Sequence, residues 1–505
     1  MRHRQASSNY SLTLSPFLKS RLSLFGEMMA VILVVWIGYS PSLWNGFVYD
    51  DEKYVVQNPL VTGDLPLRRI FTETYPPQAT AQGLYRPLTT LSYCLDASIW
   101  GVAKPNRWNG FHFTNILLHS INACLLLLIL RQLGMERGPR LAAALLFGIH
   151  PALSEAVAWV VGRAELLGLN WGLLGLYLFL RHPAGWGLAM AFVCWILAML
   201  CKENWVMWPA LVALTTGCMP KTPKFEKPKI FHLGICVAAI AAIFWWFRHL
   251  ILGSWIPPVS AFGSIDPLSR TAMALKTLWM YVGLWFWPFP LSVHHDLRPI
   301  PLSQGGFYLA AWLAMNWLIW KARTPFPWLA LAFGWYILAM FPTSNLIIPI
   351  GALSGERFMY AGVLFFAPAM ARGMEWGFAT RRISPFWKTT TIILAAIIIA
   401  LPLTMRLHGR LRDWQSNLTL WQSAARNYPE CYGIKSHLAS ALFFEGRFAE
   451  ARDVAEEALG QSARSPQPFQ KHFEPRLMEV KQKAEVILRQ QSPAGNPSPR
   501  KENKP

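Results

Sequence analysis

The sequence predicts an all-α protein: a bundle of about eleven membrane-spanning helices followed by a small helical domain. The first observation behind this prediction is composition, since 53% of the 505 residues are apolar and only 15% are charged. The second is that apolar windows of roughly 20 residues, long enough to cross a bilayer, recur along the chain. An ordinary soluble domain is therefore excluded for most of the length.

Basic residues support a membrane protein and orient it. A formal net charge of +20 would suggest a nucleic-acid partner for a soluble protein, but here Lys and Arg collect in short loops between apolar segments. By the positive-inside rule these loops are cytoplasmic, so no nucleic acid is expected, and contact with lipid headgroups is the additional interpretation. The loops are residues 131–140, 181–183, 221–229, 321–323 and 371–382.

The first span is predicted to be retained, after a cytoplasmic segment of residues 1–26. Its apolar region is longer than that of a signal peptide, and no small-x-small cleavage site follows. The membrane domain is expected to cover residues 27–405. Alternation between basic loops and outer turns places its spans near residues 27–44, 111–130, 140–158, 163–180, 185–201, 204–219, 230–251, 305–320, 326–341, 357–371 and 386–405.

Two long outer segments are expected at residues 45–110 and 252–304. Within the second, residues 276–293 are apolar but carry three tryptophans and two prolines. Tryptophan is enriched at the headgroup level, so this piece is expected to lie at the interface and not to span. Counting it as a span would also place the later basic loops outside.

Residues 406–491 are predicted to form a small exocytoplasmic helical domain, because the composition there becomes charged and helix-forming. A single repeat would bury its apolar face poorly, so we expect this domain to dock on flanking helices or on the membrane domain. It could also bind a partner protein. Residues 492–505 are expected to be a disordered tail. A tetratricopeptide-like spacing runs through Leu438, Ala439, Leu442, Gly446, Phe448, Ala451 and Ala458.

One predicted span carries a polar face. His112, Asn115, His119 and Asn122 are spaced so that they lie on one side of a helix. Polar residues inside a membrane are costly, so each is a functional candidate. Hydrogen bonding that holds the bundle together is the simpler interpretation and is favoured.

Charged residues gather at the predicted outer face. Three consecutive acids, Asp50, Asp51 and Glu52, follow the first span, and other charges lie at the outer turns. Such a surface can hold a phosphate with its cations while a carboxylate takes a proton from an incoming hydroxyl. The other charges are Arg86, Glu155, Arg163, Glu165, Lys202, Glu203, Glu356 and Arg357.

Each of these charges also has a simpler interpretation. The three acids suit the solvated start of a loop. Arg163, between Glu155 and Glu165, suits a self-neutralising structural cluster. Lys202 and Arg357 suit cations that anchor a helix end at the membrane surface.

No metal site is predicted. The seven cysteines form no CxxC pair and indicate neither a structural zinc site nor a disulfide framework. His294 and His295 precede Asp296, but adjacent histidines rarely point the same way, so loop chemistry is favoured over metal binding. A divalent cation as cofactor stays open.

Several motifs follow one another along the chain: "FVYDDEKYVVQNPLV", "YRPLTTLSYCLD", "FHFTNILLHSINA", "HPALSEAVAWVVGRAELL", "CKEN", "GERFMY" and "DWQSNLTLWQSAARNYP". In this order the sequence resembles the polytopic GT-C glycosyltransferases that use polyprenyl-phosphate sugars. Among them it is most similar to the transmembrane and tetratricopeptide-repeat O-mannosyltransferases and their bacterial relatives. The repeat region is short beside the long arrays of eukaryotic members, so no particular protein acceptor is implied.

The resemblance implies an inverting hexosyltransferase that moves mannose from a polyprenyl- or dolichyl-phosphate donor to a hydroxyl of a protein, glycan or lipid. It implies a catalytic pair, Asp50 and Asp51, with either one as general base. The expected location is a bacterial inner membrane or the endoplasmic reticulum, with residues 406–491 in the periplasm or lumen. The expected donor-phosphate ligands are Lys202, Arg357, Arg86 and Arg163. The expected substrate-binding or structural polar residues are Glu155, Glu165, His112 and Glu356.

Two other classes of function are alternatives to this one. A membrane scaffold would present the tetratricopeptide-like domain to partners, and its polar clusters would serve the fold alone. A transporter would need acids at mid-membrane and usually symmetric halves, whereas here the acids lie at span ends. Asp50→Asn or Asp51→Asn would leave a scaffold intact but remove glycosyl transfer.

Overall fold

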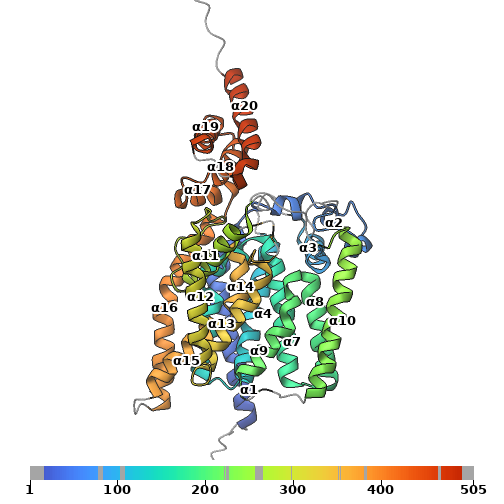
Figure 1. The fold of residues 1–505 in the computed structure, drawn as a ribbon, viewed down its shortest axis with the longest axis vertical. Helices are drawn as coiled ribbons and strands as arrows, with labels where there is room; N and C mark the ends of the chain where they lie inside the picture. The colour runs from blue at the N-terminus through green and yellow to red at the C-terminus, as the bar shows by residue number, and fades with distance from the viewer. Residues whose placement is uncertain are drawn as a thin grey trace, which may run out of the picture.

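The structure is a computed structural model, and the residues that it describes form helices and turns without a strand, which confirms the all-α prediction. Most helices stand side by side in a bundle, and the last four are stacked at one end of it (Figure 1). The expected tail, 492–505, lies outside the described residues. Those described are 16–77, 84–102, 109–220, 222, 227–255, 265–296, 298–347, 349–350, 352, 354–379, 384–464 and 468–491.

The bundle contains long helices and several short ones joined by tight turns. Its helices are α1 (Pro16–Tyr39), α2 (Pro59–Thr62), α3 (Pro87–Trp100), α4 (Gly110–Gln132), α5 (Arg137–Ile149), α6 (Ser154–Ala158), α7 (Arg163–Arg181), α8 (Gly185–Cys201), α9 (Trp208–Cys218), α10 (Lys227–Leu252), α11 (Pro267–Phe286), α12 (Leu302–Ala322), α13 (Pro327–Met340), α14 (Met359–Gly362), α15 (Phe366–Ala379) and α16 (Pro385–Asp413). The turns that matter below are η2 (Glu52–Val56), η6 (Val160–Gly162), η7 (Glu203–Met207) and η10 (Glu356–Phe358).

Four helical segments of the described chain are long and apolar enough to cross a membrane, and a fifth would be α5 with the segment after it, bent by 52°. The chain is thus a multi-pass membrane protein. The predicted count of about eleven spans is not reached by this criterion, because helices such as α9, with 11 residues, and α13, with 14, are short. The four segments are Ser20–Trp44, Gly110–Gln132, Phe231–Leu252 and Ile393–Asp413.

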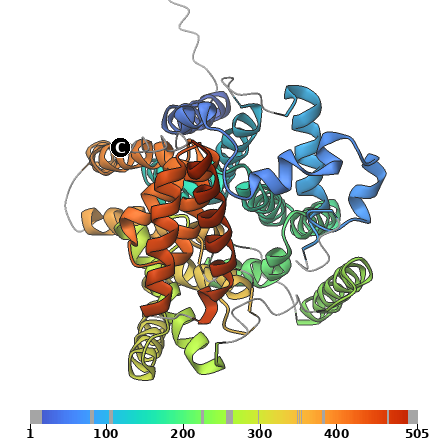
Figure 2. The same cartoon turned by 90° about the horizontal axis from the view of Figure 1, so that it is seen from above.

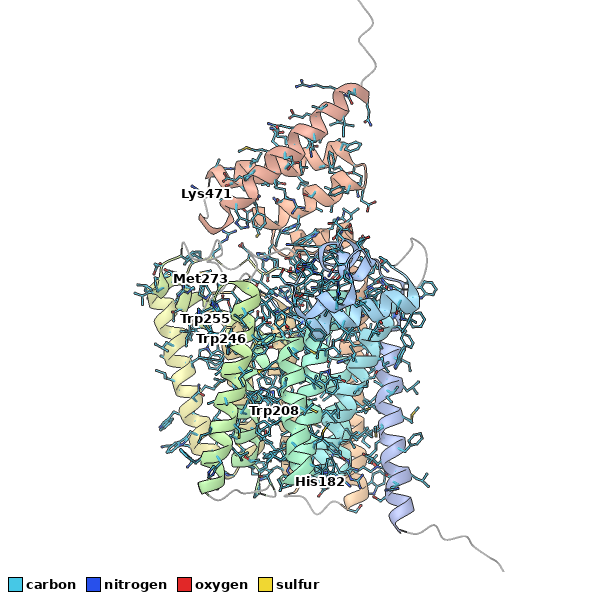
Figure 3. All side chains as sticks on the ribbon, turned by 90° about the vertical axis from the view of Figure 1, so that its right-hand side faces the viewer. His182, Trp208, Trp246, Trp255, Met273 and Lys471 are labelled. Carbon is cyan, nitrogen blue, oxygen red and sulfur yellow. The ribbon has the colours of Figure 1, made fainter. Side chains whose placement is uncertain are left out.

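The two ends of the bundle differ in the segments they carry. His182, in one of the basic loops, lies at the end opposite Met273 and Lys471 (Figure 3). Met273 belongs to α11, which holds part of the segment expected at the interface and lies near the C-terminal helices (Figure 1). This basic loop and the C-terminal helices thus lie at opposite ends of the bundle.

The predicted polar face of α4 is buried in the bundle, as its spacing indicated. His119 donates from Nε2 to the Gly148 carbonyl (3.0 Å) and accepts at Nδ1 from the Tyr360 hydroxyl (2.7 Å). Asn122 donates to the Leu166 carbonyl (3.0 Å) and to the same Tyr360 oxygen (3.1 Å). This face therefore joins α4 to its neighbours. The buried polar residues are His112, Asn115, His119 and Asn122.

Replacing Tyr360 by phenylalanine is expected to destabilise the bundle by about 1–3 kcal/mol, because the buried His119 and Asn122 each lose a hydrogen-bond partner. The measurement is thermal unfolding of the purified protein in detergent, with the wild type alongside. A Tyr360→Phe variant that unfolds at the wild-type temperature would contradict this role.

The C-terminal helices are α17 (Asn417–Asn427), α18 (Tyr432–Phe444), α19 (Phe448–Arg464) and α20 (Glu474–Gln491). Small residues of the predicted repeat pattern pack in their core, where Ala439, Ala451 and Ala458 are fully buried. Gly446, in the turn between α18 and α19, has a φ of 75°, which glycine adopts without strain. The assignment to the tetratricopeptide class stays a prediction. The expected boundary at residue 406 falls within α16.

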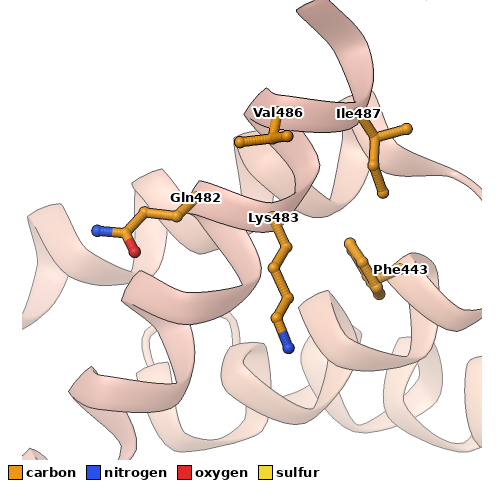
Figure 4. Close-up of a pocket in the computed structure, with 5 residues that line it drawn as sticks. All are labelled: Phe443, Gln482, Lys483, Val486 and Ile487. Atoms are coloured by element: carbon orange, nitrogen blue, oxygen red, sulfur yellow. The ribbon is translucent and has the colours of Figure 1, made fainter. Parts of the chain in front are cut away.

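The C-terminal helices also carry an apolar hollow of about 310 Å³. It is lined by Phe443 of α18 and by Gln482, Lys483, Val486 and Ile487 of α20 (Figure 4). Seen from above, these helices cover one part of the bundle end and leave α2 and α3 outside the covered area (Figure 2). No predicted site residue lines the hollow, so it is separate from the predicted site.

Candidate active site

The two aspartates of the first outer segment have different surroundings. Asp51 is fully buried, and its two carboxylate oxygens accept from the backbone N–H groups of Val48 and Val161, both at 3.0 Å. Burial raises the pKa of Asp51 to about 8, and those N–H groups oppose the rise. The Asp51 side chain thus connects the segment around Val48 to η6, and neither of its oxygens is exposed.

Asp50 is half-buried, and its backbone carbonyl accepts the N–H groups of Lys53 and Tyr54 at the start of η2. Burial raises the pKa of the Asp50 carboxyl, and the positive charge of Arg357 partly offsets that rise. Among the described residues, no side-chain hydrogen bond occupies its carboxylate. Of the predicted pair, Asp50 is therefore the one whose carboxylate is partly exposed and not occupied by a hydrogen bond among the described residues.

Arg357, in η10, is held by an ion pair and by two aromatic rings. Its Nη1 lies 2.5 Å from Oε1 of the fully buried Glu155. The guanidinium carbon lies 5.0 Å from the Trp159 ring centre and 4.6 Å from that of Phe358. The other oxygen of Glu155, Oε2, is buried and has no hydrogen-bond donor among the described residues. The site therefore holds an oriented cation and an unused acceptor.

Lys202, at the end of α8, packs on the Phe358 ring that Arg357 also contacts. It forms an ion pair with Glu165 of α7, and its Nζ lies 5.2 Å from the Phe358 ring centre. The chain after Lys202 is fixed by Trp205, whose indole lies against Gly168 and Gly172 of α7, where a Cβ atom would come within 2.2 Å of the ring. A side chain at either glycine would displace this segment.

Arg86 and Glu203 form a further ion pair beside Lys202. Nε and Nη2 of Arg86 donate to the two carboxylate oxygens of Glu203, at 3.0 and 2.7 Å. Arg86 and Arg357 both act electrostatically on Lys202. The structure thus groups Arg86, Lys202 and Arg357, each with a carboxylate partner, and the charge of Arg357 also acts on Asp50.

Arg163 belongs to a different part of the structure from the one the sequence suggested. It pairs with Asp96 of α3 at 2.6 Å and not with Glu155 or Glu165. Its other N–H groups donate to Asn115 and to the Phe111 carbonyl, both at 2.8 Å, and it is fully buried. Its guanidinium therefore links α3, α4 and α7.

Glu356 lies on the side of η10 that faces the C-terminal helices. Its Oε1 accepts from the Ser292 N–H (2.6 Å) and from His295 Nε2 (3.1 Å). Nδ1 of His295 lies 2.7 Å from the Tyr428 hydroxyl, so this histidine connects Glu356 to the segment between α17 and α18. No three His, Cys, Asp or Glu side chains of the described chain are grouped to hold a metal ion.

His112, the remaining predicted site residue, is buried in α4. Its ring lies against the backbone of Asn45 and Gly46, in the segment that follows α1.

Sequence reasoning missed Arg248, the one Lys or Arg in the apolar segment Phe231–Leu252 of α10. Its side chain is buried and packs on the Trp245 ring at 4.8 Å, and the charges of Glu203 and Arg86 act on it. α10 stands at the rim of the bundle (Figures 1 and 2). A lone charge in an apolar span was the available signal.

Comparison with known proteins identifies relatives of this chain, although no family model matches it. Protein O-mannosyl-transferase Tmtc1 of Drosophila melanogaster is 26% identical over 85% of this chain and 60% of its own length. Tmtc3 of the same organism is 24% identical over 86% of the chain and 55% of its own length. The chain is a homologue of these O-mannosyl-transferases. The resemblance seen in the motifs is thereby confirmed.

A mouse relative, TMTC3, is 24% identical over 85% of the chain and 50% of its own length. The chain thus spans about half to three-fifths of the length of these relatives. Among solved structures, an oligosaccharyltransferase of Archaeoglobus fulgidus matches with a TM-score of 0.43 and 11% identity, over 85% of this chain and 58% of that one.

Proposed function

We propose that the chain is an integral-membrane glycosyltransferase that moves a hexose, mannose by analogy with its relatives, from a polyprenyl- or dolichyl-phosphate donor to an acceptor hydroxyl. The observation that carries the proposal is the half-buried Asp50 carboxylate, on which the charge of Arg357 acts, together with the grouping of Arg357 with Lys202 and Arg86. A base next to several cations suits a reaction in which a hydroxyl loses a proton while a phosphate leaves.

The proposed step is one displacement with inversion. The acceptor oxygen bonds to the anomeric carbon as the bond from that carbon to the phosphate oxygen breaks, and the hydroxyl proton passes to Asp50. A positioned base contributes about 10²–10⁴-fold to such a step. Asp51, whose oxygens are occupied by backbone N–H groups, holds the turn that positions Asp50.

The leaving lipid phosphate takes both electrons of the broken bond and needs positive charge around it. Arg357 and Lys202, which both pack on the Phe358 ring, are the first proposed ligands, and Arg86 is the next. Arg163 is proposed to position α3, α4 and α7, because its donors are already used. Arg248 of α10, whose side chain is buried and lies within the field of Glu203 and Arg86, is added as a further cation of the site.

Three of the remaining predicted polar residues bind the sugar or hold other site residues in place. Glu155 offers its free Oε2 to a sugar hydroxyl, and Glu165 fixes Lys202. Glu356 joins η10 to the loop before α12. His112 and a divalent cation have no assigned step. The proposed setting is the periplasmic or lumenal face, with the C-terminal helices on that side.

The test uses the purified full-length chain in lipid nanodiscs with radiolabelled dolichyl-phosphate mannose and Ser/Thr-rich acceptor peptides. Label should pass to peptide with the wild type and not with Asp50→Asn. A folded wild type that neither binds nor consumes this donor, nor the corresponding glucose donor, would refute the proposal and favour the scaffold. Glycans of secreted and membrane proteins from cells with and without the gene would then show the natural acceptor.

A further inference from the structure

The C-terminal helices make direct contact with the residue that precedes Asp50. Tyr49 has a φ of 56°, in the left-handed region that a residue with a side chain seldom adopts. Its backbone N–H donates to Oδ1 of Asn417, the first residue of α17, at 2.7 Å. An unusual backbone conformation directly before the proposed base is thus held by a side chain from outside the bundle.

Asn417 is itself well placed to hold that backbone. α17 begins with a reciprocal cap, in which Ser416 Oγ accepts the Thr419 N–H (3.2 Å) and Thr419 Oγ1 accepts the Ser416 N–H (3.0 Å). Such a cap satisfies donors that would otherwise be free and fixes the first turn of the helix. Because Asn417 belongs to this ordered first turn, the backbone that carries its side-chain oxygen is held in place.

The Tyr49 ring adds a second connection between the C-terminal helices and the site. Its centre lies 5.4 Å from the Trp421 ring of α17 and 5.9 Å from the His437 ring of α18. Its centre also lies 5.7 Å from that of Trp159, the ring on which Arg357 packs. Tyr49 thus connects α17 and α18 to the surface that holds the proposed phosphate ligand.

We propose that Asn417 is a positioning residue for the transfer reaction, holding the Tyr49–Asp50 peptide so that the Asp50 carboxylate faces the acceptor. This inference rests on the proposed function. It makes the C-terminal helices part of the active site, because without the Asn417 oxygen the Tyr49 N–H loses its partner and the left-handed turn loses its support. Rotation about the Tyr49 backbone would swing the Asp50 side chain directly.

The other end of α17 provides a matched control. Asn427, the last residue of the helix, donates from Nδ2 to the Leu291 carbonyl at 3.0 Å. This bond also fastens α17 to the bundle, is made by the same residue type, and does not touch the first outer segment. A general docking role would make the two asparagines equivalent, whereas a positioning role makes only Asn417 important for the reaction.

The experiment compares Asn417→Ala, Asn417→Asp and Asn427→Ala with the wild type in the nanodisc transfer assay. Asn417→Ala is expected to lower kcat by about 10–100-fold with little change in KM, as small displacements of a reacting group do. Asn417→Asp keeps an acceptor oxygen and, like the alanine variant, removes the Asn417-Leu418-Thr419 sequon, so it should recover most of the rate. Asn427→Ala should stay within about twofold, since it leaves the geometry of the reacting groups intact.

Two further readouts separate positioning from general folding. Amide hydrogen exchange in a peptide covering residues 46–54 should speed up in Asn417→Ala and not in Asn427→Ala. The acid limb of the pH–rate profile should move to lower pH in Asn417→Ala, because a loosened turn exposes Asp50 and lowers its raised pKa.

Equal losses of rate in the two alanine variants, or a wild-type rate in Asn417→Ala, would overturn the positioning role while leaving the transferase itself in place. A wild type without transfer would instead remove the proposed function, and the positioning role with it.

Discussion

Asp50→Asn is expected to lower the rate of sugar transfer by about 10²–10⁴-fold, because an amide cannot take the proton that the acceptor hydroxyl must lose. The folded structure should survive, since no hydrogen bond of the Asp50 side chain holds it in the described chain. The measurement is kcat in the nanodisc assay together with thermal unfolding of the same preparation. Donor affinity should change little, because the proposed phosphate ligands are untouched.

Two neighbouring acids provide the controls for this variant. Glu52→Gln changes an exposed acid whose carboxylate meets only Gln57 among the described residues, so its rate should stay near that of the wild type. Asp51→Asn should mainly destabilise the protein, because its amide group would face the N–H of either Val48 or Val161. Equal kinetic losses in all three variants would contradict the assignment of Asp50 as base.

The pH dependence of transfer follows from the same carboxylate. Burial raises the pKa of Asp50, and a general base works only in its ionised form. The rate should therefore fall as pH decreases through a pKa above the ordinary value for aspartate, and this acid limb should be absent from the residual rate of Asp50→Asn. A wild-type profile that is flat throughout the acid range would count against the assignment.

The sequence was sufficient to select the segment that carries the candidate base, but not to choose between its two adjacent aspartates. The choice depends on Val161, whose N–H reaches Asp51 from 110 positions further along the chain. Periodicity correctly gave the buried face of α4, because a regular helix sets which residues share a side. It could not count the spans, since α9 and α13 are shorter than a bilayer crossing.

The sequence was also insufficient to predict which acidic side chain pairs with which basic one. Arg163 is two residues from Glu165 yet pairs with Asp96, because the direction of a side chain at the start of α7 is set by helix packing. Asn417 was not among the predicted site residues, because its contact with Tyr49 joins parts of the chain 368 residues apart. Such long-range contacts leave no local pattern.

Arg357→Gln is expected to reduce transfer by about 10²–10³-fold, the usual loss when a group that stabilises developing charge is removed. The substitution has a second effect, however. It leaves Glu155 fully buried without the cation that lies 2.5 Å away, and breaking such a pair costs about 3–5 kcal/mol of stability. In the single variant, a lower transfer rate could therefore come from the missing cation or from the lower stability of the protein.

The double variant Arg357→Gln with Glu155→Gln separates these effects. Removing both charges should restore much of the unfolding temperature, because no unpaired carboxylate stays buried. Transfer should not recover, since the leaving phosphate still lacks its cation. Arg357→Lys keeps the charge but loses the planar group that packs between Trp159 and Phe358, so an intermediate rate is expected. If the double variant regained transfer in proportion to its stability, Arg357 would be a partner for Glu155 and not a ligand for the donor phosphate.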